Sequence, residues 1–226
     1  MTLRVSFAAW DVAFTECGDG DLRVSSRGGD REDLGVVQAR VLGLLGVEGL
    51  AVPKQVHGAD VVVVDQPLVG YVVGLGEGDG VATSLPGLAA GVHVADCLPI
   101  AVGGEGGVAM LHGGWRGLAA GIVGEGVRAL RALGVQGELA AVIGPGAGRC
   151  CYETGDEVRE AFAAYDASAG RLLDLKAVAA AQLRAAGVAE VEDVALCTIC
   201  APAGVLFSHR REGPATGRQG GFAWLR

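Results

Sequence analysis

The chain has 226 residues, of which 50% are hydrophobic and 19% are charged, and its formal net charge is −8. This length fits one domain, residues 1–226, that can bury a sizeable core. The negative charge disfavours broad electrostatic binding, so we expect no nucleic-acid partner and no attraction to an anionic membrane surface.

The mean hydropathy of +0.40 is high, but the apolar runs are short. The run GLAAGVHVADCLPIAVGG, for example, is interrupted by His93, Asp96 and Pro99. No run reaches the roughly 20 residues that a membrane-spanning helix needs. The first residues, MTLRVSFAAWDVAF, suggest a strand and are not followed by a signal cleavage site. We therefore expect a cytoplasmic protein whose six cysteines are reduced thiols or ligands.

Apolar periodicity and glycine spacing predict a mixed order of elements. In the first half of the chain we expect a strand at 4–8, a Gly/Asp-rich loop at 18–30, a helix at 33–46, and strands at 52–56, 60–65, 80–83, 91–102 and 107–112. In the second half we expect a helix from 117 to 133, a strand at 139–143, and helices at 155–165 and 174–186. The last predicted elements are strands at 191–198, 205–209 and 222–225. The strands cluster around a few helices without strict alternation. This order indicates a layered α+β fold and not a doubly wound sheet.

Three residues lie in settings that together suggest one metal site. They are His57 in VPKQVHGADV, Cys97 in VADCLPIAV and His112 in VAMLHGGWRG. Two imidazoles and a thiolate suit zinc, and three protein ligands leave a fourth position open for chemistry. Taken alone, a histidine in a strand is more often a structural residue, and a cysteine in an apolar strand is usually an inert core thiol. The glycines that follow both histidines favour the metal hypothesis, because they let the backbone approach a ligand closely.

Two neighbours of these residues have different expected roles. Arg116 follows the glycines after His112 at the start of a predicted helix, and both arginine and helix amino termini attract anions. Asp96 precedes Cys97 and would point to the opposite face of a strand, so we interpret it as a supporting or turn carboxylate and not as a ligand.

The remaining cysteine motifs are less informative. Cys197 and Cys200 form a CxxC motif without a second pair, which disfavours a zinc ribbon. Cys150 and Cys151 are adjacent and cannot project to the same face of a strand. We interpret all four as structural thiols, with a redox or second-metal role as the alternative.

The chain resembles the YfiH-like family in the order and spacing of eight motifs: KQVHGADV, DGVATS, VADCLPIAV, LHGGWRGLAAGI, IGPGAGRCCYETGDEV, LCTIC, FSHRR and TGR. This family carries the labels multicopper polyphenol oxidase, laccase-domain protein and purine nucleoside phosphorylase. The resemblance covers the chain from about Val52 to the end. It implies a four-layer α/β/β/α sandwich with mixed β-sheets, similar to the deamidase domain of cytotoxic necrotising factor toxins. It also implies zinc binding by His57, Cys97 and His112.

The activity that the resemblance implies is phosphorolysis of adenosine, inosine, guanosine and 5′-methylthioadenosine, with some adenosine deamination. Zinc with an open position can lower the pKa of bound water to about 7, which suits deamination. Phosphorolysis also needs groups that hold the nucleoside and phosphate. The candidates in matching motifs are Gln55, Arg116, Arg210, Arg211 and Arg218. We give Arg116 the most weight because its motif adjoins a ligand.

Two other functions compete with this one. The older family label implies a copper-dependent polyphenol oxidase, but multicopper chemistry needs many imidazoles and the chain has four histidines. The third hypothesis is a hydrolase or deamidase in which Cys97 is the nucleophile and His112 the base.

The amino-terminal quarter departs from the family pattern. Glu16 or Cys17 stands where the family has an arginine. We expect this change to weaken phosphate binding and to favour deamination.

Overall fold

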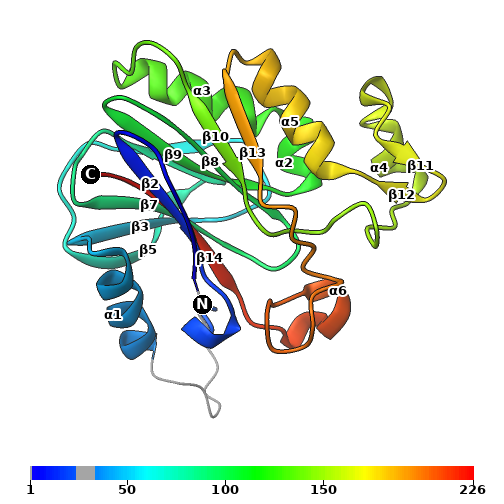
Figure 1. Cartoon of the computed structure of the whole chain (residues 1–226), viewed down its shortest axis with the longest axis horizontal. Coiled ribbons are helices and arrows are strands. Elements are labelled where there is room, and N and C mark those ends of the chain that lie inside the picture. Colours follow the sequence, from blue (N-terminus) through cyan, green and yellow to red (C-terminus); the bar gives the residue numbers. More distant parts are fainter. Residues whose placement is uncertain (1, 24–33) are drawn as a thin grey trace.

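The computed structural model describes residues 2–23 and 34–226, which form two six-stranded sheets packed face to face (Figure 1). The first sheet has the order β1 (Leu3–Ser6), β2 (Trp10–Phe14), β14 (Gln219–Leu225), β7 (Leu88–Val94), β3 (Gly49–Lys54) and β5 (Gly70–Glu77). The second has the order β13 (Glu190–Asp193), β10 (Ala140–Ile143), β8 (Leu98–Gly104), β9 (Gly107–Gly113), β6 (Gly80–Thr83) and β4 (Val61–Val64). Both sheets are mixed, since β3 runs parallel to β5 and β7, while β4–β6 and β10–β13 are parallel pairs in the second sheet.

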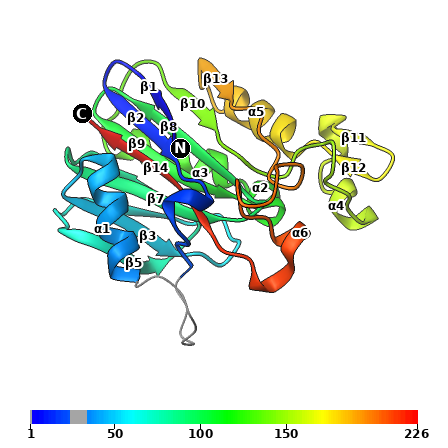
Figure 2. The same ribbon diagram turned by 60° about the horizontal axis from the view of Figure 1, so that its bottom comes forward.

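Helices cover the outer face of each sheet (Figure 2). Helix α1 (Leu34–Leu45) packs Val37 and Val41 against the first sheet, where Phe222 and Trp224 lie. Ala223, between these two aromatic residues, faces the second sheet, as the alternation of a strand requires. Helices α2 (Trp115–Ala120), α3 (Ile122–Ala132) and α5 (Leu175–Ala185) cover the second sheet. The predicted four-layer α/β/β/α sandwich is confirmed.

One predicted helix is divided into two. The sequence predicted a helix from 117 to 133, but Gly121 has φ +92° and separates α2 from α3. Its N–H bonds the carbonyls of Gly117 and Leu118, which caps α2. Glycine adopts this left-handed conformation at little cost, and α3 can therefore start in a new direction.

The predicted strand at 91–102 is also wrong as a single element. Residues 95–97 form a turn between β7 and β8, and Asp96 has φ +85°. An aspartate tolerates this conformation better than most residues do. Because β7 and β8 belong to different sheets, Cys97 lies where the chain passes from one sheet to the other.

Several shorter elements also differ from expectation. The amino-terminal run suggested one strand, but residues 3–14 form the antiparallel pair β1 and β2. Strand β5 was not predicted. The predicted strand at 205–209 is wrong, because the helix α6 (His209–Glu212) begins there. The side chain of its N-cap residue, Ser208, accepts a hydrogen bond from the backbone N–H of Arg211. The predicted helix at 155–165 is reduced to α4 (Asp156–Glu160) and a 3₁₀ turn. Most of the predicted loop at 18–30, and the first residue of the predicted helix at 33–46, lie outside the described residues. Within residues 2–23 and 34–226, no helix has the length and apolar character needed to cross a membrane.

Candidate metal centre and substrate cleft

Three chain segments bring the predicted ligands together at one end of the sandwich. His57 follows β3 of the first sheet, Cys97 lies in the turn between the sheets, and His112 lies near the end of β9 in the second sheet. Their ligand atoms all lie within 4.8 Å of one another. The two imidazole rings have centroids 4.8 Å apart and meet edge to face at 72°.

The buried carboxylate of Asp79 holds this arrangement. Its Oδ2 accepts the N–H groups of Val56 at 3.1 Å and Gly58 at 2.6 Å. Its Oδ1 accepts the His57 N–H at 2.9 Å and lies 2.7 Å from Nδ1 of His112. His57 has φ +62°, a conformation that costs energy for a non-glycine residue, and these hydrogen bonds stabilise it. Asp79 was not among the predicted site residues, although it opens the DGVATS motif directly before β6.

The hydrogen bond to Asp79 also fixes the tautomer of His112. A carboxylate only accepts hydrogen bonds, so Nδ1 of His112 carries the proton and Nε2 is left for Cys97 or a metal ion. Burial lowers the pKa of His112, but Cys97 and Asp79 raise it more, to about 9. Burial raises the pKa of Cys97, but His112 and His57 lower it more, to about 6. In the metal-free chain these two residues therefore form a thiolate–imidazolium pair.

The glycines of the GGWRG motif allow α2 to pass close to the ligands. A Cβ on Gly114 would lie 3.2 Å from Sγ of Cys97 and 3.3 Å from Cδ2 of His57. A Cβ on Gly117 would lie 2.8 Å from the carbonyl oxygen of Gly58. Side chains at these positions would displace the ligands or the loop that carries one of them.

The residues present fit zinc. The three donors are two nitrogens and a sulfur. The buried carboxylate of Asp79 leaves Nε2 of His112 available to a metal ion, and the low pKa of Cys97 keeps its sulfur as a thiolate. No fourth cysteine or histidine completes the group in the described part of the chain, so the donor set is that of an open site.

His57, Cys97 and His112 line a cleft of about 840 Å³. This volume lies within the range of small-molecule sites and exceeds the needs of a nucleoside. Polar, aromatic and charged residues share its lining with the ligands: Arg23, Lys54, Gln55, His93, Asp96, Trp115, Tyr152, His209, Arg210 and Arg218.

Two arginines concentrate positive charge in the cleft. Arg23 donates to Asp21 Oδ2 at 3.2 Å, and the backbone N–H of Arg218 donates to Oδ1 of the same carboxylate at 2.9 Å. Nη1 of Arg218 also donates to the carbonyl of Gly217 at 2.8 Å. Burial lowers the pKa of Arg218, and repulsion from Arg23 lowers it further, although Asp21 offsets part of this shift. An anion bound between them would relieve this repulsion. Nothing in the Gly/Asp-rich sequence around Arg23 singled it out.

The other predicted substrate-binding residues are placed differently. Arg210 lines the cleft with its guanidinium 5.5 Å from the ring centroid of Tyr152. Arg116 is exposed, stacks on Trp115 at 4.3 Å and is not among the lining residues.

Gln55 lines the cleft, but its amide pairs with the backbone of His93. Nε2 donates to the His93 carbonyl, and Oε1 accepts the His93 N–H, both at 2.9 Å. Arg211 donates to the carbonyls of Thr198 and Ala201, so its guanidinium supports a loop and does not enter the cleft.

The two remaining histidines lie beside the three ligands without joining them. Nε2 of His93 lies 2.7 Å from the hydroxyl of Tyr71. Burial and Arg218 lower the pKa of His93 to about 4, so its imidazole is neutral. His209 lines the cleft at the start of α6. No group of metal-binding residues in the described ranges contains more than two histidines, which does not favour a multicopper site.

The divergent amino-terminal residues do not reach the cleft. Cys17 begins a 3₁₀ turn, its N–H donates to the carbonyl of Val205 at 3.0 Å, and neither it nor Glu16 is a lining residue. The segment instead supplies Arg23.

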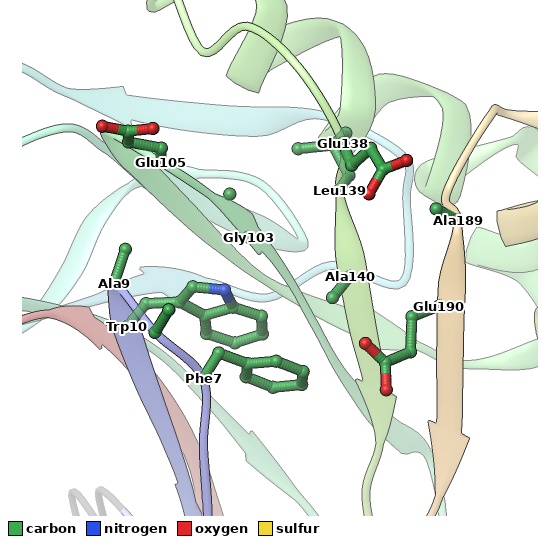
Figure 3. A pocket seen from close by; sticks show the side chains of 12 residues that line it. Phe7, Ala9, Trp10, Gly103, Glu105, Glu138, Leu139, Ala140, Ala189 and Glu190 are labelled. Carbon is green, nitrogen blue, oxygen red and sulfur yellow. The ribbon is translucent and has the colours of Figure 1, made fainter.

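A second cleft, of about 610 Å³, lacks this chemistry. Phe7 and Trp10 stack there with ring centroids 4.2 Å apart, and Glu105, Glu138 and Glu190 surround them (Figure 3). Its lining contains no histidine, cysteine, lysine or arginine. The catalytic candidates therefore all belong to the cleft that contains His57, Cys97 and His112.

Residues 22–226 match the model of the family described as multi-copper polyphenol oxidoreductase laccase. The chain belongs to this family, which includes YfiH. Purine nucleoside phosphorylase YfiH of Escherichia coli K12 is 35% identical over 183 residues, which cover 76% of this chain and 72% of that protein. A purine nucleoside phosphorylase of Mycobacterium bovis is 34% identical over 210 residues, which cover 88% of this chain and 82% of that protein.

Solved YfiH-family structures share the fold. YlmD from Geobacillus stearothermophilus superposes with a TM-score of 0.81 at 30% identity and covers 97% of this chain and 93% of its own. YfiH from Bacillus licheniformis gives a TM-score of 0.80 at 25% identity, and the superposition covers 96% of this chain and 93% of that one. The resemblance seen in the sequence motifs is confirmed.

The low pKa of Cys97 predicts an unusual alkylation profile in protein from which metal has been removed. The thiolate is the reactive form, so a lowered pKa moves the rise in rate to lower pH. Alkylation of Cys97 by iodoacetamide should rise with a midpoint near pH 6, whereas Cys17, whose pKa burial raises above the ordinary value of 9.0, should react only in alkaline solution. Peptide mass spectrometry over a pH series measures both. Identical profiles for the two cysteines would show that His57 and His112 do not stabilise the Cys97 thiolate.

Proposed function

We propose that the chain is a zinc-dependent purine nucleoside phosphorylase that acts on adenosine, inosine, guanosine and 5′-methylthioadenosine and also deaminates adenosine. The observation that carries this proposal is the single cleft that contains both the His57–Cys97–His112 group and the cations Arg23 and Arg218. The family relatives named purine nucleoside phosphorylase support it.

The lining of the cleft can bind both substrates. Trp115 and Tyr152 offer flat aromatic surfaces on which a purine can stack. Arg23 and Arg218 offer guanidinium groups that suit the oxygens of phosphate. Holding phosphate beside the ribose converts a two-molecule reaction into attack within one complex, which is a large part of the expected rate gain.

His57, Cys97 and His112 would hold zinc, and Asp79 would keep the proton of His112 on Nδ1. When bound, zinc supplies a Lewis acid next to the substrate. The half-buried position of Cys97 and the buried position of His112 keep water away from two of the three ligands.

The test is release of free base from adenosine by the zinc-loaded protein. Release should depend on phosphate concentration, while formation of inosine should not, because deamination uses water. Chromatography separates adenine, hypoxanthine, inosine and adenosine in one assay. Absence of base release at saturating phosphate would refute the phosphorylase proposal, and absence of inosine would refute the deaminase part alone.

Replacement of Arg218 by alanine should raise the KM for phosphate about ten- to a hundredfold. This range corresponds to loss of a charge-assisted hydrogen bond of about 1.5–3 kcal/mol. The matched control is Arg184→Ala, which removes an exposed cation on α5 outside the cleft lining and should leave this KM nearly unchanged. Initial rates over a phosphate series measure the effect. Equal effects of the two substitutions would show that Arg218 does not bind the phosphate.

One observation favours a second candidate, a Cys–His hydrolase or deamidase. Cys97, His112 and Asp79 form a continuous series of hydrogen-bonded groups, which is the arrangement of a thiol nucleophile, its base and the carboxylate that orients the base. The metal-free protein distinguishes the two functions. A hydrolase would release ammonia from a glutamine-containing peptide without metal and would be inhibited by zinc, whereas the phosphorylase would need zinc.

A further inference from the structure

A second group of metal-binding side chains lies outside the cleft. Cys150 and Cys151 come from the loop after β10, and Cys197 and Cys200 come from the loop after β13. Their four sulfur atoms all lie within 4.8 Å of one another. Over residues 2–23 and 34–226, this group and the His57–Cys97–His112 group are the two sets of three or more such side chains that could hold an ion.

The backbone places the two loops side by side. Strands β10 and β13 are parallel neighbours, visible together in Figure 1, and their pairing ends at Ile143 and Asp193. Backbone hydrogen bonds continue the alignment beyond the strands: Val194 N–H donates to the Ile143 carbonyl at 3.1 Å, and Thr198 N–H donates to the Gly146 carbonyl at 3.0 Å. The approach of the cysteines is therefore set by the sheet and not by the side chains alone.

The adjacent pair converges because it lies in a turn. Residues 149–151 form a turn, so the alternation of a strand does not separate Cys150 from Cys151, and the expectation that they diverge was wrong. Sγ of Cys200 lies 3.1 Å from Sγ of Cys150 and 2.7 Å from Sγ of Cys151. A Cβ on Gly148 would lie 3.1 Å from Cβ of Cys197, so a side chain at this position would push the two loops slightly apart.

The CxxC turn is shaped to stabilise a thiolate. Sγ of Cys197 accepts the Gly148 N–H at 3.2 Å and also the backbone N–H of Cys200. Hydrogen bonds of this kind favour the charged sulfur, and the charged sulfur is the form that binds metal.

We propose that Cys150, Cys151, Cys197 and Cys200 bind one zinc ion in a closed, structural site. Four thiolates select zinc or iron among the metals common in proteins, and they leave no open position for a substrate. Tetrahedral coordination with zinc–sulfur bonds of about 2.3 Å places the sulfurs about 3.8 Å apart. Sγ of Cys200 would therefore have to move about 1 Å away from Sγ of Cys150 and Sγ of Cys151 on binding. A disulfide would use only two of the four sulfurs and would not explain why the other two lie close to them.

The site would stabilise one wall of the cleft. The hydroxyl of Thr198, inside the CxxC motif, donates to Oδ1 of Asp96 at 2.6 Å, directly before the ligand Cys97. The backbone N–H of Arg210 donates to Oδ2 of the same carboxylate at 2.7 Å. Tyr152, which follows Cys151, lines the cleft. A metal that holds the two loops together would thus fix Asp96 and Tyr152 without taking part in the reaction.

The experiment is a metal count on protein purified under reducing conditions in the presence of zinc. Native mass spectrometry should show two zinc ions per chain. Cys97→Ala should retain one, and the double substitution Cys150→Ser with Cys200→Ser should also retain one. Cys17→Ser is the matched control, because Cys17 is a partly buried cysteine that belongs to neither group, and it should retain two.

X-ray absorption on zinc-loaded Cys97→Ala leaves the four cysteines intact and so does not depend on whether the double variant folds. The remaining zinc should have four sulfur neighbours at about 2.3 Å. A single zinc in the wild-type chain that is lost in Cys97→Ala would overturn the proposal. So would a remaining zinc with nitrogen or oxygen neighbours, or a disulfide among the four cysteines in the reduced preparation. None of these readouts uses enzyme activity. This proposal can therefore fail while the phosphorylase proposal stands, and the phosphorylase proposal can fail while this one stands.

Discussion

Replacement of Cys97 by alanine is expected to remove one zinc ion per chain and to slow phosphate-dependent base release by roughly a thousandfold. The loss follows because Cys97 is the only anionic donor of the His57–Cys97–His112 group, and the two imidazoles that remain make a weak zinc site. Lewis-acid stabilisation contributes several kcal/mol, and about 4 kcal/mol corresponds to a thousandfold change in rate. Metal analysis and initial-rate kinetics on the same preparation measure both effects.

Cys17→Ala is the control for this experiment, since it removes a thiol outside both metal-binding groups. It should keep the zinc content and the rate of the wild type. If Cys97→Ala keeps the full zinc content of the wild type, the three residues are not the ligands. If it loses zinc but keeps its rate, the metal is not part of the reaction.

Replacement of Asp79 by asparagine should lower the zinc affinity of the cleft site about ten- to a hundredfold, the usual effect of losing a carboxylate that orients a ligand. Each oxygen of Asp79 accepts from two donors, so the amide NH₂ of asparagine must face two N–H groups in either orientation. When it faces His112, the imidazole has to move its proton to Nε2, which removes the lone pair that binds metal. When it faces Val56 and Gly58, the loop that carries His57 loses its support.

The same substitution should also destabilise the chain by about 2–4 kcal/mol, because buried N–H groups lose their acceptor. Competition with a fluorescent chelator measures the affinity, and thermal unfolding in the absence of metal measures the stability separately. Asp65→Asn serves as control, since Asp65 is exposed and its replacement should change neither quantity. An unchanged zinc affinity in Asp79→Asn would mean that the carboxylate supports the loop alone and has no influence on the metal site.

The layered fold could be predicted because its signals are local. Alternating and continuous apolar runs marked most strands, and an aspartate start and a glycine stop marked α5 within a residue of its ends. The break between β7 and β8 could not be seen, because residues 91–102 are apolar almost throughout and the turn depends on the positive φ of one aspartate. Such a run fits one long buried strand as well as two strands in different sheets.

The candidate site was predictable to a similar extent. His57, Cys97 and His112 are distinguished by residue type and by neighbouring glycines, and the structure brings them together. Asp79 acts through backbone N–H groups more than 20 residues away in sequence, and nothing in its immediate neighbours indicates those contacts. Arg23 lies in a Gly/Asp-rich loop, and nothing in its sequence neighbours marks it as a binding residue.

The four-cysteine group was missed for a different physical reason. Adjacent cysteines diverge only in an extended chain, and Cys150 and Cys151 lie in a turn. The convergence of the two loops also depends on the parallel pairing of β10 with β13, which brings together segments almost 50 residues apart. Sequence spacing alone contains no information on that pairing.

The position of Cys97 in the turn between β7 and β8 has a mechanical consequence. His57 is attached to the first sheet, His112 to the second, and Cys97 to the segment that joins them. A single ion bound by all three would therefore cross-link the two sheets at one end of the sandwich. The two sheets could not slide past one another without breaking a metal–ligand bond. The ion would contribute to the rigidity of the whole molecule as well as to the chemistry at its edge.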